Sequence, residues 1–132
     1  MMPNLERIKL WTDELRSDTV GKQTTGRLRN EFGRCCLGVG ADVAIKHQCH
    51  TIWNGDCIED FYDRSNSDAT FTPNVFEWYG LREYNPILKV PPHLEHKLDM
   101  NINSKHATTL NDVHKFTFAE IADCIDYTWP QA

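Results

Sequence analysis

Residues Glu31–Ile45 read EFGRCCLGVGADVAI, and the run from Cys36 to Ile45 contains a single charged residue, Asp42. Apolar side chains recur there at three- and four-residue spacing, which predicts a helix. A helix that is apolar nearly all round is buried on most sides. Gly38 and Gly40 each disfavour a helix by about 0.5–1 kcal/mol relative to alanine. They therefore indicate close approach of another backbone, or a helix that begins after Cys36.

Three further segments carry helix signals around this central one. An N-cap and an apolar stripe predict a helix over residues 4–17, beginning at Asn4. Pro73 at the first position and Gly80 just past the end favour a helix over 73–80. Thr117 and Glu120 stand three residues apart, as in a capping box, and predict a helix over 117–128.

Strand signals are weaker and lie in the middle of the chain. Asn54–Gly55 is a strong turn signal, which predicts either a hairpin or a turn into a short helix. Prolines bracket a predicted edge strand within residues 85–92, and 106–110 is its candidate partner. We therefore expect one α+β domain over residues 1–132, with three to four helices packed on a small antiparallel sheet.

Length, charge and cysteine content restrict the class of protein. The 132 residues carry a formal net charge of −5, which argues against broad DNA binding because that needs a basic face. No apolar run approaches the roughly 20 residues that span a membrane, and the N-terminus lacks the apolar stretch of a secretion signal. Five cysteines, an odd number, then favour reduced thiols in a cytosol.

The adjacent cysteines, Cys35 and Cys36, are the first candidates for chemistry. Neighbouring helical side chains point about 100° apart, so the two thiols are poorly placed to hold one metal. Cysteine is also among the most buried residue types, so we expect core packing, with Cys35 the more exposed of the pair. The predicted core contact joins Cys36, Leu37, Val39 and Val43 to Phe118, Ile121 and Ile125 of the last helix.

A metal site has one set of candidate ligands, which are of the types that zinc prefers: His47, Cys49, His50 and Cys57. Their spacing matches no common zinc pattern, and surface histidines beside a buried cysteine explain them better. We therefore expect no metal and no cofactor.

Binding of an anionic ligand has two groups of candidates. Arg27, Arg29 and Arg34 offer guanidinium groups suited to phosphates. Asn111 and Asp112 come shortly before a helix N-terminus, where backbone N–H groups bind anions. The alternatives are a solvated arginine-rich turn and turn residues that bind the local backbone. The sequence contains neither G-x-S-x-G nor H-E-x-x-H, and we expect no enzyme.

Three segments together resemble a known group of proteins. They are GRLRN with RCCLGVGADVA, then FEWYGL, then TTLNDVHKFTFAEIADCID. The combination is similar to small, mostly uncharacterised proteins of tailed bacteriophages and their prophages. The resemblance implies phage origin and action in the cytoplasm of the bacterial host, and it brings no activity with it.

Size, acidity and this resemblance favour a non-enzymatic phage accessory protein that binds and inhibits or modulates a host defence or transcription protein. Acidic surfaces engage nucleic-acid-binding proteins through complementary charge. Two alternatives are a sponge that sequesters a nucleotide signal through the arginines and a virion accessory subunit. A homo-oligomer is compatible with each.

Overall fold

The computed structural model describes residues 2–131 and shows an α+β fold. The helices within that range are α1 (Leu5–Leu15), α2 (Cys36–Lys46), α3 (Pro73–Trp78), the 3₁₀ helix η1 (Pro92–Lys97), α4 (Ala107–Asp112) and α5 (Phe118–Thr128). The strands are β1 (Thr51–Asn54), β2 (Cys57–Asp60) and β3 (Asn66–Ser67). The fold class is as expected, but three to four helices were too few.

The additional helix α4 replaces a predicted strand. Residues 106–110 begin with a single antiparallel bridge between Ile87 and His106, after which the chain turns into α4. The bridge agrees with the expected pairing of these two segments. It does not extend because Ala107 and Leu110 lie one helical turn apart and both are buried.

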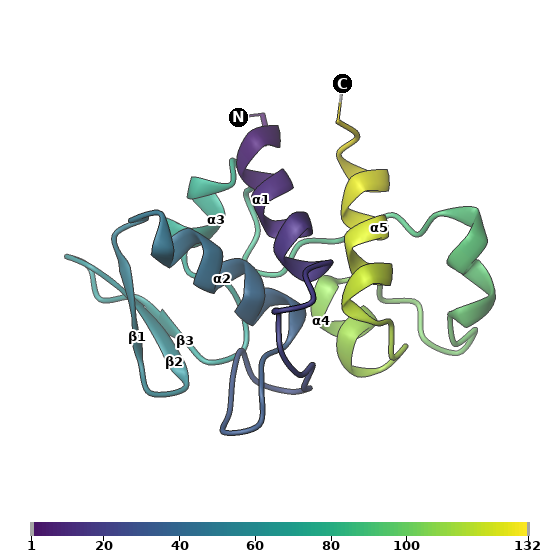
Figure 1. Cartoon of the computed structure of the whole chain (residues 1–132), viewed down its shortest axis with the longest axis horizontal. Coiled ribbons are helices and arrows are strands. Elements are labelled where there is room, and N and C mark those ends of the chain that lie inside the picture. Colours follow the sequence, from purple (N-terminus) through teal and green to yellow (C-terminus); the bar gives the residue numbers. More distant parts are fainter. Residues whose placement is uncertain (1, 132) are drawn as a thin grey trace.

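The helices α1 and α5 form the centre of the molecule and run antiparallel, so that the start of α1 and the end of α5 lie at the same end of the fold (Figure 1). Helix α1 begins where the Asn4 side chain accepts a hydrogen bond from the Arg7 backbone N–H. Helix α5 begins with the predicted capping box between Thr117 and Glu120. These local signals act within one turn of chain, so their position follows from the sequence.

Helix α2 is buried along its length, and Cys36, Leu37, Val39 and Val43 are core residues as predicted. It packs mainly against α1, α4 and α3, whereas α5 packs mainly against α1 and α4. The expected direct packing of α2 on α5 is therefore not the main contact. Cys35 is only slightly more exposed than Cys36, because its sulfur lies at the helix N-cap and accepts the Gly38 N–H.

The two glycines of α2 are required by neighbours on different sides. A Cβ on Gly38 would lie 1.8 Å from the backbone carbonyl oxygen of Leu28. A Cβ on Gly40 would lie 2.8–2.9 Å from ring atoms of Phe71 and Trp11. The predicted close approach of another backbone is therefore found at Gly38, while at Gly40 two aromatic rings leave no room for a side chain.

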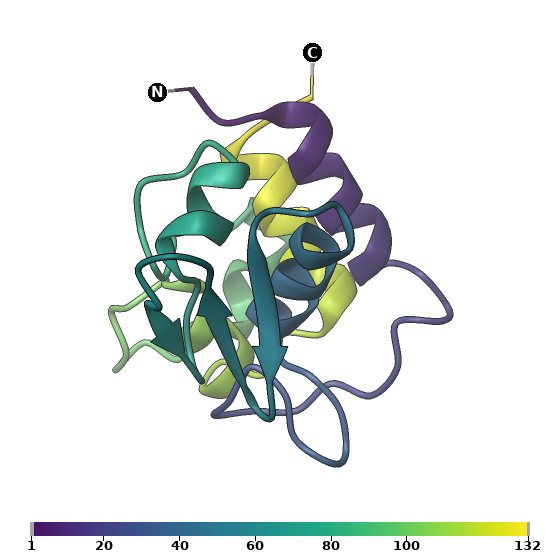
Figure 2. The ribbon, with the colours of Figure 1, turned by 90° about the vertical axis from the view of Figure 1, so that its left-hand side faces the viewer.

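The three-stranded antiparallel sheet has the order β1–β2–β3 and lies at one side of the molecule, on the left in Figure 1 and facing the viewer in Figure 2. Asn54 pairs with Cys57 across the turn at Gly55, as the turn signal predicts for a hairpin. The described helices pack chiefly on one another rather than on this sheet, contrary to the expected arrangement. The sheet is too short to cover a helix, and of the residues in its strands Ile58 is the one large apolar side chain in the core.

Helix α3 shows how the sheet is joined to the helices. Gly80 has a φ of +74°, and the Leu81 N–H binds the Phe76 carbonyl, which is the predicted Schellman ending. At the other end, the Thr72 side chain makes no cap hydrogen bond. The buried carboxylate of Asp60 in β2 instead accepts from the Asn74 N–H at 2.9 Å and from the Thr72 hydroxyl. A strand residue therefore caps this helix.

Candidate functional site

The three candidate arginines lie near the β1–β2 hairpin, but each is held by other protein groups. Arg27 pairs with Asp68 at 3.4 Å. Arg29 donates two hydrogen bonds to the Gly55 carbonyl, and its guanidinium carbon lies 3.9 Å from the centre of the Trp53 ring. These contacts fix the hairpin against the 27–34 loop.

Arg34 has the most buried surroundings of the three. It binds the Asp42 carboxylate at 2.7 Å and the Val20 carbonyl at 2.6 Å. Asp42 also accepts from the Trp53 indole N–H and pairs with Lys46. The arginine therefore joins the 20–34 loop to α2 rather than presenting its N–H groups to solvent.

Asn111 is nearly fully buried and joins three segments. Its side-chain oxygen accepts from the Cys36 N–H at 3.1 Å and from Gln23, and its amide donates to the Thr24 carbonyl. The neighbouring Asp112 accepts the Gly26 N–H. Both residues therefore bind backbone, and Asn111 satisfies a first-turn N–H of α2 from a distant part of the chain.

His47, Cys49 and His50 of the candidate metal set line one surface pocket, whereas Cys57 does not. Residues 2–131 contain no group of three or more His, Cys, Asp or Glu side chains placed to hold a metal ion. Cys49 is buried, while His47 stacks near Trp78 with a ring separation of 5.7 Å. Cys57 lies on β2 opposite Asn54.

The adjacent cysteines are held as protonated thiols in the core. Burial raises the pKa of Cys35 to about 11, against the smaller effect of hydrogen bonds from backbone N–H groups. Burial also raises the pKa of Cys36, and the nearby Cys35 adds to that shift. A thiolate is the nucleophilic form of cysteine, so these two side chains are poor nucleophiles at neutral pH.

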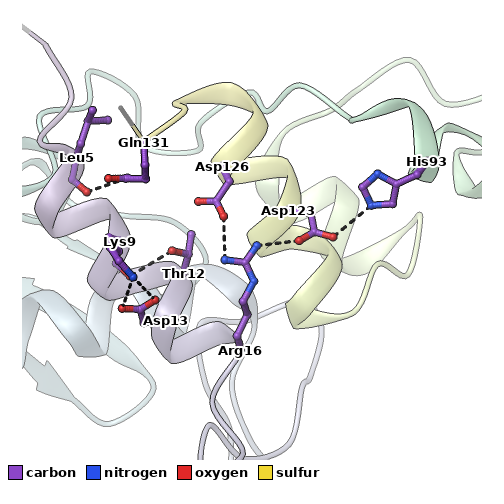
Figure 3. A network of polar contacts seen from close by, with 9 residues as sticks. All are labelled: Leu5, Lys9, Thr12, Asp13, Arg16, His93, Asp123, Asp126 and Gln131. Atoms are coloured by element: carbon purple, nitrogen blue, oxygen red, sulfur yellow. Dashed lines mark hydrogen bonds and ion pairs between the residues drawn. The ribbon is translucent and has the colours of Figure 1, made fainter.

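A polar clamp joins α1 to α5 and to the segment that carries η1 (Figure 3). Arg16 of α1 binds Asp123 at 2.7 Å and Asp126 at 2.8 Å, both on α5. The His93 ring lies 3.2 Å from the second oxygen of Asp123. Since these groups satisfy one another across three elements, the cluster acts as a structural clamp.

Three large apolar side chains, Ile52 of β1 and Phe61 and Tyr62 of the turn after β2, are exposed, and we call them the hairpin patch. Their exposed fractions are 47%, 40% and 92%. All three line one open pocket of about 420 Å³. Glu59 and Arg64 line the same pocket and pair with each other at 2.9 Å. The patch is thus an apolar surface next to an internally neutralised ion pair.

Charge is concentrated around the hairpin patch. Between His50 and Thr70 the sequence has five acidic residues and one basic residue, a formal charge of −4 out of −5 for the chain. Asp56 and Asp63 are exposed, and neither has an ion-pair partner in the described part of the chain. The patch therefore lies in the most acidic part of the chain.

A second pocket, of about 490 Å³, lies where the first turns of α1 meet the end of α2 and α3. We call it the α1–α3 groove, and Arg7, Tyr62, Glu77 and Trp78 line it together with His47, Cys49 and His50 of the candidate metal set. The Arg7 guanidinium lies 4.6 Å from the centre of the Trp78 ring and donates to the Trp78 carbonyl at 2.9 Å. Tyr62 borders both this groove and the hairpin patch.

Sequence reasoning named three residues that line the α1–α3 groove, His47, Cys49 and His50, but as metal ligands, and it did not identify the hairpin patch. Arg7 stands on the polar face of the first helix, which is typical of any solvated helix. The accessible signal was the density of acidic residues beside aromatic ones in IEDFYDR, Ile58–Arg64. It could have predicted an acidic apolar surface on the hairpin.

Within residues 2–131, no helix has the length and apolar character needed to cross a membrane. No curated protein and no solved structure matches the chain. One protein-family model, described as Domain of unknown function (DUF8296), matches residues 4–129. That match covers all the helices and strands of the fold, and the chain belongs to this family.

Proposed function

We propose that this chain is a non-enzymatic, phage-encoded accessory protein that binds a host protein through the hairpin patch and inhibits or modulates it. The observation that carries the proposal is the gathering of Ile52, Phe61 and Tyr62 on an acidic surface. Exposed aromatic and large apolar side chains that share one pocket are the usual anchors of protein interfaces. The resemblance to phage proteins supplies the host context.

Charge selects the kind of partner. Because the hairpin segment carries most of the chain's net negative charge, a second copy of this surface is repelled and a basic surface is attracted. A host protein that binds nucleic acid has such a basic surface. The expected partner therefore inserts an apolar side chain between Ile52 and Phe61 and surrounds it with lysine or arginine.

The test uses two isoleucines of similar exposure. Ile52 is 47% exposed on the patch, and Ile87 is 55% exposed near α4. Tagged wild-type protein should capture a stoichiometric basic partner from lysate of the bacterial host, more weakly at high salt. Ile52→Ala and Phe61→Ala should each weaken binding of the purified partner by about 10-fold or more, and Ile87→Ala should leave it unchanged.

Three results would contradict the proposal. Equal loss with Ile52→Ala and Ile87→Ala would show that the patch is not the binding surface. Self-association that depends on Ile52 in analytical ultracentrifugation would assign the patch to a second copy. Recovery of the protein in purified phage particles by mass spectrometry would make it a virion subunit.

A further inference from the structure

The α1–α3 groove holds charged side chains of both signs that do not pair with each other. We propose that it binds a nucleotide. The Arg7 guanidinium would bind the phosphate, the Glu77 carboxylate would accept hydrogen bonds from ribose hydroxyl or base amino groups, and the Tyr62 ring would stack on the base. This inference is independent of the partner-binding function of the hairpin patch, although Tyr62 borders both surfaces.

Arg7 provides the anion contact. Three arginines line the pockets described for this chain, and two of them are neutralised: Arg16 by Asp123 at 2.7 Å and Arg64 by Glu59 at 2.9 Å. Arg7 instead donates one N–H to the Trp78 carbonyl and has no carboxylate partner among residues 2–131. Its remaining N–H groups are available to phosphate, whose oxygens match the guanidinium fork.

Glu77 narrows the class of ligand. It is exposed in the same groove, and no described residue donates a hydrogen bond to its carboxylate. A carboxylate repels a simple anion, so inorganic phosphate alone fits the groove poorly. A nucleotide carries both an anionic phosphate and neutral donors, namely ribose hydroxyls and base amino groups, and these donors suit Glu77.

Tyr62 supplies a surface for the base. Its side chain is 92% exposed and lines the groove. A base stacked on an aromatic ring is stabilised by about 1–3 kcal/mol, largely independent of base identity. The groove volume of about 490 Å³ lies within the range of about 300–1,000 Å³ found for small-molecule sites.

The groove also explains why the arginines predicted from the sequence are not needed for this chemistry. Arg27, Arg29 and Arg34 are bound to Asp68, the Gly55 carbonyl and Asp42. Arg27 and Arg34 are paired with carboxylates, and Arg29 gives two N–H groups to one carbonyl. Arg7 gives a single N–H to the Trp78 carbonyl, which leaves more of its N–H groups without a protein acceptor among residues 2–131.

The experiment is calorimetric titration of the full chain with AMP, inorganic phosphate and adenosine. AMP should bind at least about 10-fold more tightly than inorganic phosphate or adenosine, because it makes both the phosphate and the base contacts. Arg7→Gln should weaken AMP binding by about 10-fold or more. Arg82→Gln is the matched control, because Arg82 is exposed and does not line the groove, and it should bind AMP as the wild type does.

Glu77→Gln provides a second, independent readout, because Glu77 is exposed and its replacement does not disturb the Arg7–Trp78 contact. This variant should bind inorganic phosphate more tightly and AMP more weakly than the wild type. Equal affinity of the wild type for AMP and phosphate would overturn the nucleotide assignment. So would loss of AMP binding in Arg82→Gln as large as in Arg7→Gln, or a parallel rise for both ligands in Glu77→Gln. Partner capture through the hairpin patch should be unaffected by each variant.

Discussion

Single atoms decide which side chains α2 tolerates. At Gly38 the neighbour is the Leu28 carbonyl oxygen, which also accepts the Cys35 N–H at 3.0 Å and is therefore fixed in place. At Gly40 the neighbours are ring atoms of the buried Trp11 and Phe71 side chains rather than backbone atoms. Glycine is thus needed at Gly38 because of a neighbouring backbone and at Gly40 because of neighbouring aromatic rings.

Replacement of these glycines by alanine should lower the free energy of unfolding by different amounts at the two positions. We expect Gly38→Ala to destabilise the protein by about 3 kcal/mol, because the new methyl group overlaps fixed backbone. Gly40→Ala should cost less, about 1–2 kcal/mol, since side chains rather than backbone must adjust to the new methyl group. Urea unfolding of both variants measures the difference, and an equal cost at the two positions would contradict this account.

At the scale of the elements, two helices are capped by residues from elsewhere in the chain. Asn111 binds the Cys36 N–H of α2, and Asp60 binds the Asn74 N–H of α3. The three donors on Asp60 include the hydroxyls of Thr51 and Thr72. Because a cap of this kind forms only when two elements meet, it couples the stability of each element to the other.

Asp60 should therefore be among the most sensitive polar positions. Asp60→Ala leaves the three donors without an acceptor and should destabilise the protein by about 3 kcal/mol. Asp60→Asn keeps one acceptor oxygen and should cost about 1–2 kcal/mol. Asp18→Ala, at an exposed aspartate, serves as the control and should change stability by less than about 0.5 kcal/mol in chemical denaturation. A cost at Asp60 no larger than at Asp18 would show that the carboxylate does not hold α3 to the sheet.

Helix α5 has an acid-sensitive start. Burial alone would raise the pKa of Glu120, but hydrogen bonds from Lys97 and from the Thr117 backbone outweigh it and lower the pKa. A carboxyl whose pKa is lower in the folded state stabilises the protein fully above its unfolded pKa of about 4.3. That contribution is lost as the pH falls through the lower folded value.

The variant Glu120→Gln should therefore lose stability at neutral pH and converge on the wild type in acid. Urea unfolding at neutral pH and at about pH 3 checks this, with Glu83→Gln at an exposed loop position as the control. A difference between Glu120→Gln and wild type that stays constant with pH would contradict the proposed role of the charge.

At the scale of the whole molecule, one core collects side chains from every helix. Four of the five cysteines lie in it: Cys35, Cys36, Cys49 and Cys124. Burial raises the pKa of Cys124 to about 12, so its thiol, like that of Cys35, stays protonated near neutrality.

Thiol titration with an aromatic disulfide should reveal this distribution. The native protein should react quickly at a single thiol, that of Cys57, which is the only cysteine not buried. All five should react in urea, and Cys57→Ser should abolish the fast reaction. Rapid reaction of a second native thiol would show that the core opens locally.

The sequence by itself determined the features that depend on neighbours within about four residues. The Asn4 cap, the capping box at Thr117, the Gly55 turn and the Gly80 ending were all predictable, because each closes its hydrogen bonds within one turn of chain. Buried α2 followed from its composition in the same way.

Only the tertiary structure decided which groups those elements meet. The Arg34–Asp42 pair, the Asn111 and Asp60 caps and the convergence of Arg7 with Glu77 join residues far apart in sequence or on different elements. A guanidinium or carboxylate forms the same kinds of bond with many partners, so its chemistry does not specify one. The partner is set by the packing of α1, α2 and α3 around the core, which is why three arginines predicted to bind a ligand bind the protein itself.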